Sequence, residues 1–423
     1  AEPARPPRTH PPHYSVHLST IFTTYSKGTT TMSRTSRDLR IAVVGAGFAG
    51  QGHAFGFRNA QMLPALKGVN VRLDTLVEPN APLAETVAAK YGFERTAAGI
   101  EEIIDRPEIE AVSLALPNNA YIGVVPRLLK AGKHVFCEKP LGLTSAEAEE
   151  MTRAAEEAGV VTSVGFCRRR VPALAALAQV VRDGGIGTVH SFRASYFADY
   201  ASDPKAPRTW RFVRSVAGGG AVADIGAHII DTVRFVLGDV AEVIACRLET
   251  VIRERPLPTG GTGHSQGASA TESGPVENDD NAVISLRTAG GAIGSVSLSR
   301  IAAGITDVFA IEVYGDKGWA KFESPHSDEF YLCQPEQSAP GLDGPRQIIA
   351  GPDLPYFGDV ACMPGRGVGT GYGENLIGEI QEFLAAVVGK GEVTVPFAEA
   401  IPTMRIIEAA QKAAATGAPV ALA

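Results

Sequence analysis

A short apolar run that ends in three glycines is the feature that most restricts the fold of this chain. Residues 40–44 are predicted to form a buried strand, and Gly45, Gly47 and Gly50 follow in a G-x-G-x-x-G pattern. The first glycine permits a tight turn, the second lets the backbone approach a pyrophosphate, and the third lets the next helix pack closely. Because a helix N-terminus attracts phosphate, the pattern indicates a dinucleotide-binding unit, although purely structural turns also carry it.

The second predicted strand, within residues 69–80, places Glu78 at its end. A carboxylate at this position binds the ribose hydroxyls of the adenosine. It also repels a 2′-phosphate, and no Arg or Lys follows closely, so NAD is expected and NADP is disfavoured. The alternative for Glu78 is a surface acid at a strand end.

Apolar runs and helical patterns then alternate with short connections between residues 111 and 166. This rhythm predicts an α/β fold with a doubly wound, mainly parallel sheet and helices on both faces. Ligands bind at the carboxyl ends of such strands. The cofactor-binding residues expected on this basis are Gly45, Gly47, Phe48, Ala49, Gly50, Glu78, Pro117, Asn118 and Glu138.

Within residues 218–238, three glycines at 218–220 precede a predicted amphipathic helix with an unusual polar face. On a helical wheel, Asp224, His228 and Asp231 lie within about 60° of one another, opposite an apolar stripe. A solvated face ordinarily carries Lys, Glu and Arg. A histidine flanked by carboxylates suits general acid–base chemistry, because the carboxylates set its tautomer or raise its basicity. Such a face is also able to hold a cation, but no other histidine has ligand spacing, and no metal is expected.

Lys139 follows a fully apolar strand and precedes Pro140, which fixes the backbone and orients the lysine. The glycine pattern, the Glu138-Lys139-Pro140 turn and the G-G-x-x-x-D-I-G-x-H-x-x-D pattern together resemble the Gfo/Idh/MocA oxidoreductases, from about residue 40 to the end. The resemblance implies a Rossmann domain followed by an α+β domain whose large, open, mainly antiparallel sheet forms the oligomer interface. It also implies that Lys139, Asp224 and His228 form the catalytic set beside the nicotinamide.

The chain departs from that family pattern at two places. Tyr121 stands where many members have a histidine, and Cys167-Arg168 replaces an Asn-Tyr pair. These differences bear on the substrate and leave the reaction class unchanged.

Further stretches, above all residues 191–212, resemble the levoglucosan dehydrogenase-like sugar 3-dehydrogenases of the family. Aromatic faces and charged hydrogen-bonding groups are what a sugar pocket uses. Tyr196 and Trp210 are also compatible with a place in the core. The resemblance implies a substrate pocket of Lys139, Arg169, Tyr196, Asp199, Trp210, Asp224 and His228.

Six segments between residues 187 and 324 read as successive strands, with a hairpin at the TAGGA sequence. Few helices are available to cover such a sheet, so a homo-oligomer, dimer or tetramer, is expected. Two Gly/Pro/Ser-rich segments, 253–280 and 334–370, are predicted to be long loops.

Composition bounds the remaining possibilities. A chain of 423 residues with net charge −7 favours two domains and disfavours nucleic acid or a membrane surface as the main partner. No apolar run approaches the roughly 18 residues of a membrane span. Five scattered cysteines argue against disulfides and zinc and favour a reducing compartment, the cytoplasm. We expect a disordered tail at 1–39, with a transit peptide as the alternative, an NAD-binding domain at 40–165 and a substrate-binding and oligomerisation domain at 166–423.

These inferences converge on an NAD-dependent dehydrogenase that oxidises a secondary hydroxyl, possibly at C3, of a sugar, anhydrosugar or glycoside. One alternative retains its cofactor and oxidises transiently to help cleave a glycosidic bond. A second is a cofactor-binding regulator without activity.

Overall fold

The described part of the chain begins with strand β1 (Arg37–Val44), because the computed structural model describes residues 37–260 and 267–422. Most of the expected tail, residues 1–36, lies outside the described residues. The first strand begins at Arg37, three residues before the expected start of the domain at residue 40. The backbone N–H of Arg37 donates to the carbonyl of Gly68 at 3.0 Å, and Arg37 is paired with Val69 of β2.

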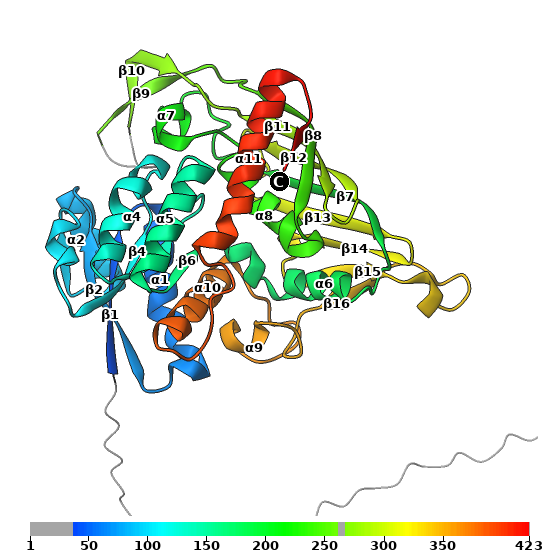
Figure 1. The fold of residues 1–423 in the computed structure, drawn as a ribbon, viewed down its shortest axis with the longest axis horizontal. Helices are drawn as coiled ribbons and strands as arrows, with labels where there is room; N and C mark the ends of the chain where they lie inside the picture. The colour runs from blue at the N-terminus through cyan, green and yellow to red at the C-terminus, as the bar shows by residue number, and fades with distance from the viewer. Residues whose placement is uncertain (1–36, 261–266, 423) are drawn as a thin grey trace, which may run out of the picture. The chain divides into compact units, whose positions relative to one another are not determined.

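The first sheet has six parallel strands in the order β3-β2-β1-β4-β5-β6, as predicted for a doubly wound fold (Figure 1). Its other strands are β2 (Val69–Val77), β3 (Arg95–Ala97), β4 (Ile109–Leu114), β5 (His134–Cys137) and β6 (Thr162–Val164). The helices in this half are α1 (Phe48–Asn59), α2 (Ala81–Tyr91), α3 (Glu101–Ile104), α4 (Tyr121–Lys130) and α5 (Ser145–Ala158).

Side chains of β1 alternate between two cores, which is why both faces of the sheet need helices. Ala42 and Val44 pack with α4 and α5, whereas Leu39, Ile41 and Val43 pack with α1 and α2. The second core also contains residues of α10 (Tyr372–Val387), which comes from the C-terminal part of the chain. The first sheet is therefore covered in part by a helix that follows eight of the nine strands of the second sheet in sequence.

The second sheet has nine strands in the order β16-β15-β14-β13-β7-β12-β11-β8-β17. Its pairs are antiparallel except for β7 and β12, as the family resemblance implied. The strands are β7 (Val189–Phe197), β8 (Val240–Glu249), β11 (Asn281–Thr288), β12 (Ile293–Ser299), β13 (Val308–Gly315), β14 (Gly318–Glu323), β15 (Glu329–Cys333), β16 (Arg346–Ile349) and β17 (Val420–Ala421).

Three helices, α6 (Pro172–Arg182), α8 (Ile225–Leu237) and α11 (Phe397–Thr416), pack on one face of this sheet. The red α11 crosses it in Figure 1. The opposite face keeps apolar side chains in solvent: in β11, Ile284 is fully buried while its neighbour Val283 is 53% exposed. Among the described elements no helix covers this face, which is the condition under which a second subunit is expected.

Both predicted long loops contain regular structure. The first holds a separate two-stranded sheet, β9 (Glu254–Thr259) with β10 (Gly267–Pro275), and the second holds β16 and the short helix α9 (Phe357–Val360). Their sequences are rich in Gly, Pro and Ser, so strand formation depends on pairing with a neighbour rather than on propensity. The remaining short helix, α7 (Arg214–Ala217), precedes the three glycines. No described helix combines the length and hydropathy that a membrane span requires.

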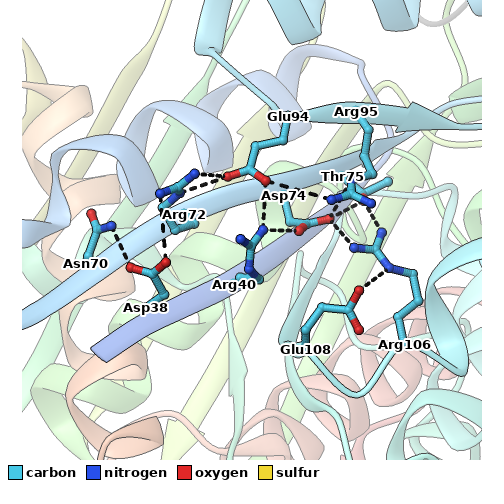
Figure 2. Close-up of polar contacts among 10 residues, drawn as sticks. All are labelled: Asp38, Arg40, Asn70, Arg72, Asp74, Thr75, Glu94, Arg95, Arg106 and Glu108. Atoms are coloured by element: carbon cyan, nitrogen blue, oxygen red, sulfur yellow. Dashed lines mark hydrogen bonds and ion pairs between the residues drawn. The ribbon is translucent and has the colours of Figure 1, made fainter. Parts of the chain in front are cut away.

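An ion-pair network ties β1 to β2 and to the segments around β3 and β4 (Figure 2). Arg40 of β1 donates to Asp74 at 2.6 Å and to Glu94 at 2.7 Å. Asp74 is fully buried in β2 and also pairs with Arg106 at 2.9 Å and Arg95 at 3.4 Å. A buried carboxylate surrounded by guanidinium groups holds these strands in one register.

Candidate active site

The glycine turn between β1 and α1 has the geometry that its sequence predicts. Gly45 has φ +99°, and a Cβ there would lie 2.3 Å from the carbonyl oxygen of Ala115. A Cβ on Gly50 would lie 1.8 Å from the carbonyl oxygen of Gly45. A Cβ on Gly47 meets no described atom within 4 Å, although Gly47 is the cap of α1. Gly45 and Gly50 are therefore required by the fold, whereas Gly47 leaves space at a helix N-terminus, where a pyrophosphate fits.

Glu78 follows β2 and supports this turn. One carboxylate oxygen accepts from the backbone N–H of Ala46 at 3.1 Å, and the other accepts from the N–H of Asn80 at 3.0 Å. The side chain is buried, so the interpretation as an ordinary surface acid is wrong. Each oxygen retains a second lone pair, which a ribose hydroxyl is able to use.

The other expected cofactor residues border the same edge of the sheet. Phe48 and Ala49 form the first turn of α1, with the Phe48 ring 73% exposed. Asn118 lies directly after Pro117 at the end of β4, and its amide donates to the carbonyl of Ala217 at 2.9 Å. This bond links the first sheet to the segment that leads into α8.

Glu138 is held from two sides at the end of β5. Its carboxylate accepts from the backbone N–H of Lys139 at 3.1 Å and lies 3.2 Å from Nε2 of His53, a buried residue of α1 that sequence reasoning did not single out. Burial alone would raise the pKa of Glu138, but the hydrogen bond and charge of His53 lower it. Glu138 therefore fixes the backbone from which Lys139 projects.

Lys139, which follows β5 of the first sheet, forms an ion pair with Asp224, the residue before α8. The lysine Nζ lies 2.9 Å from Oδ1 of Asp224. Oδ2 of Asp224 accepts from the hydroxyl of Tyr200 at 2.8 Å and lies 3.5 Å from Nε of Arg211. Burial raises the pKa of Asp224, but the charges of Lys139 and Arg211 outweigh it and lower the pKa strongly. Asp224 is therefore an anion that orients the lysine.

His228 lies one turn further along, in the first turns of α8. Its ring is 6% exposed and stands against the rings of Phe166 and Tyr196, at centroid distances of 6.4 and 6.2 Å. Within the described residues its Nδ1 has no hydrogen-bond partner. Burial, then the charges of Lys139 and Arg168, lower the pKa of His228 well below its usual value. The imidazole is therefore neutral and able to accept a proton.

The helix itself starts later than predicted, at Ile225, with Asp224 as its cap residue. The preceding glycines serve a backbone contact, because a Cβ on Gly220 would lie 1.9 Å from the carbonyl oxygen of Asp279. The Asp279 carboxylate accepts from the N–H groups of Gly220 and Val222 at 2.8 and 2.9 Å. This tight turn aims Asp224 toward Lys139.

Comparison with known proteins agrees with the family resemblance of the sequence motifs. Residues 39–166 match the profile of an oxidoreductase family with an NAD-binding Rossmann fold, and residues 174–321 match the GFO/IDH/MocA C-terminal domain. The chain belongs to the Gfo/Idh/MocA family. It is an NAD-binding oxidoreductase.

Named relatives are sugar and polyol dehydrogenases. Levoglucosan dehydrogenase of Pseudarthrobacter phenanthrenivorans is 35% identical over 90% of this chain and 97% of its own. Myo-inositol 2-dehydrogenase of Thermotoga maritima is 30% identical over 66% of this chain and 74% of its own. A solved levoglucosan dehydrogenase in complex with NADH and L-sorbose superposes with a TM-score of 0.84 at 33% identity, over 92% of this chain and 99% of that one.

Asp231, on the polar face of the predicted helix, and Arg169, an expected sugar contact, form an ion pair with each other. Asp231 accepts from Nε of Arg169 at 2.8 Å, and Arg169 also pairs with Glu399 at 3.0 Å. Arg169 is buried in this ion-pair cluster, so the structure gives it a core contact where sequence analysis expected a sugar contact. Asp231 lies in the helix as the helical wheel predicted, but its carboxylate is paired with the guanidinium of Arg169.

Tyr196, Asp199 and Trp210 are the remaining expected pocket residues. Tyr196 of β7 is buried beside His228, and Asp199 follows in the next loop, partly exposed. The ring of Trp210 lies 4.5 Å from the guanidinium of Arg211, which in turn reaches Asp224. Within the described residues no cluster of His, Cys, Asp or Glu is arranged to hold a metal ion.

The sequence did not predict three residues that contact the expected site residues: Tyr200 and Arg211, which contact Asp224, and Arg168, which contacts Tyr196. Tyr200 and Arg211 flank Asp199 and Trp210 in the same loop, so their position was the available signal. Arg168 was noted only as a departure from the family pattern. Its guanidinium bonds the hydroxyl of Tyr196 at 2.9 Å.

Proposed function

We propose that this protein is an NAD-dependent sugar dehydrogenase that oxidises a secondary hydroxyl of a sugar, anhydrosugar or glycoside to a ketone, with C3 as the position. The observation that carries the proposal is the meeting of Lys139 and Asp224 at 2.9 Å, next to a buried neutral His228 and at the edge where the glycine turn lies. The levoglucosan and inositol dehydrogenases among the relatives support the substrate class.

In this proposal His228 takes the proton of the reacting hydroxyl. Its burial keeps the ring neutral before the reaction, and a neutral imidazole is the form that accepts a proton. Lys139 donates a hydrogen bond to the same oxygen and stabilises its developing negative charge. Asp224, held by Tyr200, keeps the ammonium group in place.

The residues present fit NAD, since Gly47 leaves room at the α1 N-terminus and Glu78 keeps free lone pairs beside it. When bound, NAD supplies the hydride acceptor. Gly45, Gly50, Phe48, Ala49, Pro117, Asn118 and Glu138 complete the proposed cofactor site; Tyr196, Asp199 and Trp210 complete the proposed sugar site. We further propose that residues 40–165 bind the cofactor and that residues 166–423 bind substrate and form a homo-oligomer.

The test is the absorbance of NADH at 340 nm with purified protein, NAD and a panel of levoglucosan, myo-inositol, glucose and methyl glycosides, repeated with NADP. We expect NADH formation with a pyranose or anhydropyranose, and weaker activity with NADP because of Glu78. A flat trace across the panel, with nucleotide that stays bound through gel filtration, would favour the retained-cofactor glycoside chemistry or the regulator instead.

A further inference from the structure

Three consecutive arginines in the turn Cys167–Arg170 are all buried, but they have different surroundings. Arg169 pairs with Asp231 and Glu399, and Arg170 bonds the Tyr356 hydroxyl at 2.9 Å and pairs with Glu382. The guanidinium groups of Arg169 and Arg170 are therefore both paired within the protein interior. Arg168, only 4% exposed, pairs instead with Asp307, whose side chain is 44% exposed.

The guanidinium of Arg168 lies among three aromatic rings. Its central carbon is 5.5 Å from the ring of Tyr196, 5.1 Å from that of Phe309 and 5.1 Å from that of Tyr372. A desolvated cation among aromatic faces is fixed in position and strongly attracts its carboxylate partner. One terminal nitrogen of Arg168 bonds both oxygens of Asp307, at 2.9 and 3.1 Å, so the orientation of that carboxylate is set from inside the protein.

Tyr196 connects this cluster to the catalytic base. Its ring lies 6.2 Å from that of His228, and its hydroxyl accepts from Arg168. Beside the buried arginine, the Asp307 carboxylate and the Tyr372 ring (41% exposed) are open to solvent. The cluster thus presents an oriented acceptor and an aromatic face, and Tyr196 links its arginine to His228.

We propose that Asp307, held by Arg168, and the ring of Tyr372 form the specificity subsite that binds the sugar hydroxyls next to the oxidised carbon. The inference rests on the proposed function. An oriented carboxylate accepts hydrogen bonds from neighbouring hydroxyls, and an aromatic face packs against the C–H face of a pyranose. The subsite selects a neutral polyhydroxylated ring, since its own charges are already paired.

The test compares Asp307→Asn with Asp239→Asn in steady-state kinetics with NAD and levoglucosan. Asp239 is a matched control, because it is also an exposed carboxylate paired with a buried arginine, Arg234, at 3.2 Å, but outside the site. For Asp307→Asn we expect a KM for levoglucosan raised by about 10- to 100-fold, the loss of hydrogen bonds to a charged group. The kcat should stay within about threefold, and NADH affinity should not change. Asp239→Asn should leave all three at wild-type values.

A second variant and two analogues separate recognition from a structural effect. Tyr372→Ala should raise KM in the same way. With 2-deoxy- and 4-deoxy-levoglucosan, the wild type should lose catalytic efficiency, and Asp307→Asn should lose less, because its uncharged amide oxygen is already a weaker acceptor than the carboxylate. An unchanged KM in Asp307→Asn, or a fall in kcat and melting temperature with analogue discrimination intact, overturns the subsite while wild-type turnover upholds the proposed function. A wild type that binds NADH but oxidises no sugar of the panel overturns the proposed function itself, and the subsite with it.

Discussion

At the scale of single residues, the protonation state of His228 decides the pH range of the reaction. A pKa lowered by burial and by two neighbouring cations means that the imidazole is protonated only well below pH 6.5. The base form is therefore present throughout the neutral and mildly acidic range. We predict that kcat/KM stays on its plateau as the pH falls through 6.5 and declines only below it. A decline centred near pH 6.5–7 would show an unperturbed histidine.

Removal of His228 completes this test. His228→Ala should lower kcat by about 10²- to 10⁴-fold, the usual contribution of a positioned general base. His190→Ala, a solvent-exposed histidine of β7, serves as the control and should retain full activity. Near-normal turnover in His228→Ala would remove His228 from the mechanism.

Glu379 of α10 carries a buried carboxyl group whose two oxygens have no hydrogen-bond partner among the described residues. Burial, then the charge of Glu138, raise the pKa of Glu379 well above its usual value, so folding favours the protonated acid. A raised pKa stabilises the fold below the unfolded value of about 4.3, and this stabilisation is lost as the pH rises. Glu379→Gln, which mimics the protonated acid, should therefore raise the melting temperature at pH 8 by several degrees.

The pH dependence of that gain distinguishes ionisation from packing. The difference between the melting temperatures of Glu379→Gln and wild type should shrink as the pH falls from 8 and approach zero at about pH 4, below the unfolded pKa. The exposed Glu392→Gln should show no difference at either pH. A gain of equal size at both values would contradict the assignment of a raised pKa.

At the scale of elements, the glycine turn separates the needs of the fold from those of the cofactor. Because a Cβ on Gly47 meets no described atom, Gly47→Ala should fold with wild-type stability, but its methyl group occupies the space where the backbone approaches the pyrophosphate. We predict a roughly 10-fold or larger rise in the Kd for NADH, measured by fluorescence titration. Gly123→Ala in α4, where a Cβ is equally unobstructed, should bind NADH normally.

The network around Asp74 makes the first sheet sensitive to acid. Burial raises the pKa of Asp74, but hydrogen bonds from Thr75 and Arg40 and the charges of Arg106 and Arg95 outweigh it and lower that pKa. The hydrogen bond from Arg40 also lowers the pKa of Glu94. A depressed pKa contributes stability above the unfolded value of about 4, and this stability is lost as the pH falls further. Arg40→Met should lower the melting temperature clearly at pH 7, and the gap to wild type should close below about pH 4. The exposed Arg153→Met should show no such gap.

The sequence allowed prediction of elements whose pattern is local. The parallel strands, the glycine turn and the antiparallel hairpin at residues 281–299 agree with their apolar periods. β9, β10 and β16 were missed because their segments are rich in Gly, Pro and Ser and show no apolar period, although β9 pairs with the adjacent β10 and β16 pairs with the preceding β15. In the site, the helical spacing of Asp224 and His228 predicted that they lie on one face. The ion pair between Asp231 and Arg169 could not be predicted in this way, because the two residues are 62 positions apart in sequence. Contacts of that range leave no periodic signal in one sequence.

At the scale of the whole molecule, the bare face of the nine-stranded sheet predicts self-association. Val283 of β11 is 53% exposed and Ile293 of β12 is 45% exposed on strands that are hydrogen-bonded to each other. A second copy of the same sheet would cover them. We predict an oligomer by light scattering coupled to size-exclusion chromatography. The double variant Val283→Lys, Ile293→Lys should dissociate it, while Leu342→Lys, an exposed apolar residue in a loop, should not.

The helix α10 gives the chain an unusual order of assembly. Phe383 packs against Phe136 of β5 at 5.7 Å, and Ile380 and Leu384 fill the same core as Phe57 of α1. During synthesis, residues 37–166 therefore leave the ribosome without the helix that closes one of their cores. More than two hundred further residues must be translated before α10 is available. Synthesis of the nucleotide-binding half begins first, and its core is completed only near the end of the chain. A messenger truncated after β16 therefore encodes neither half in finished form.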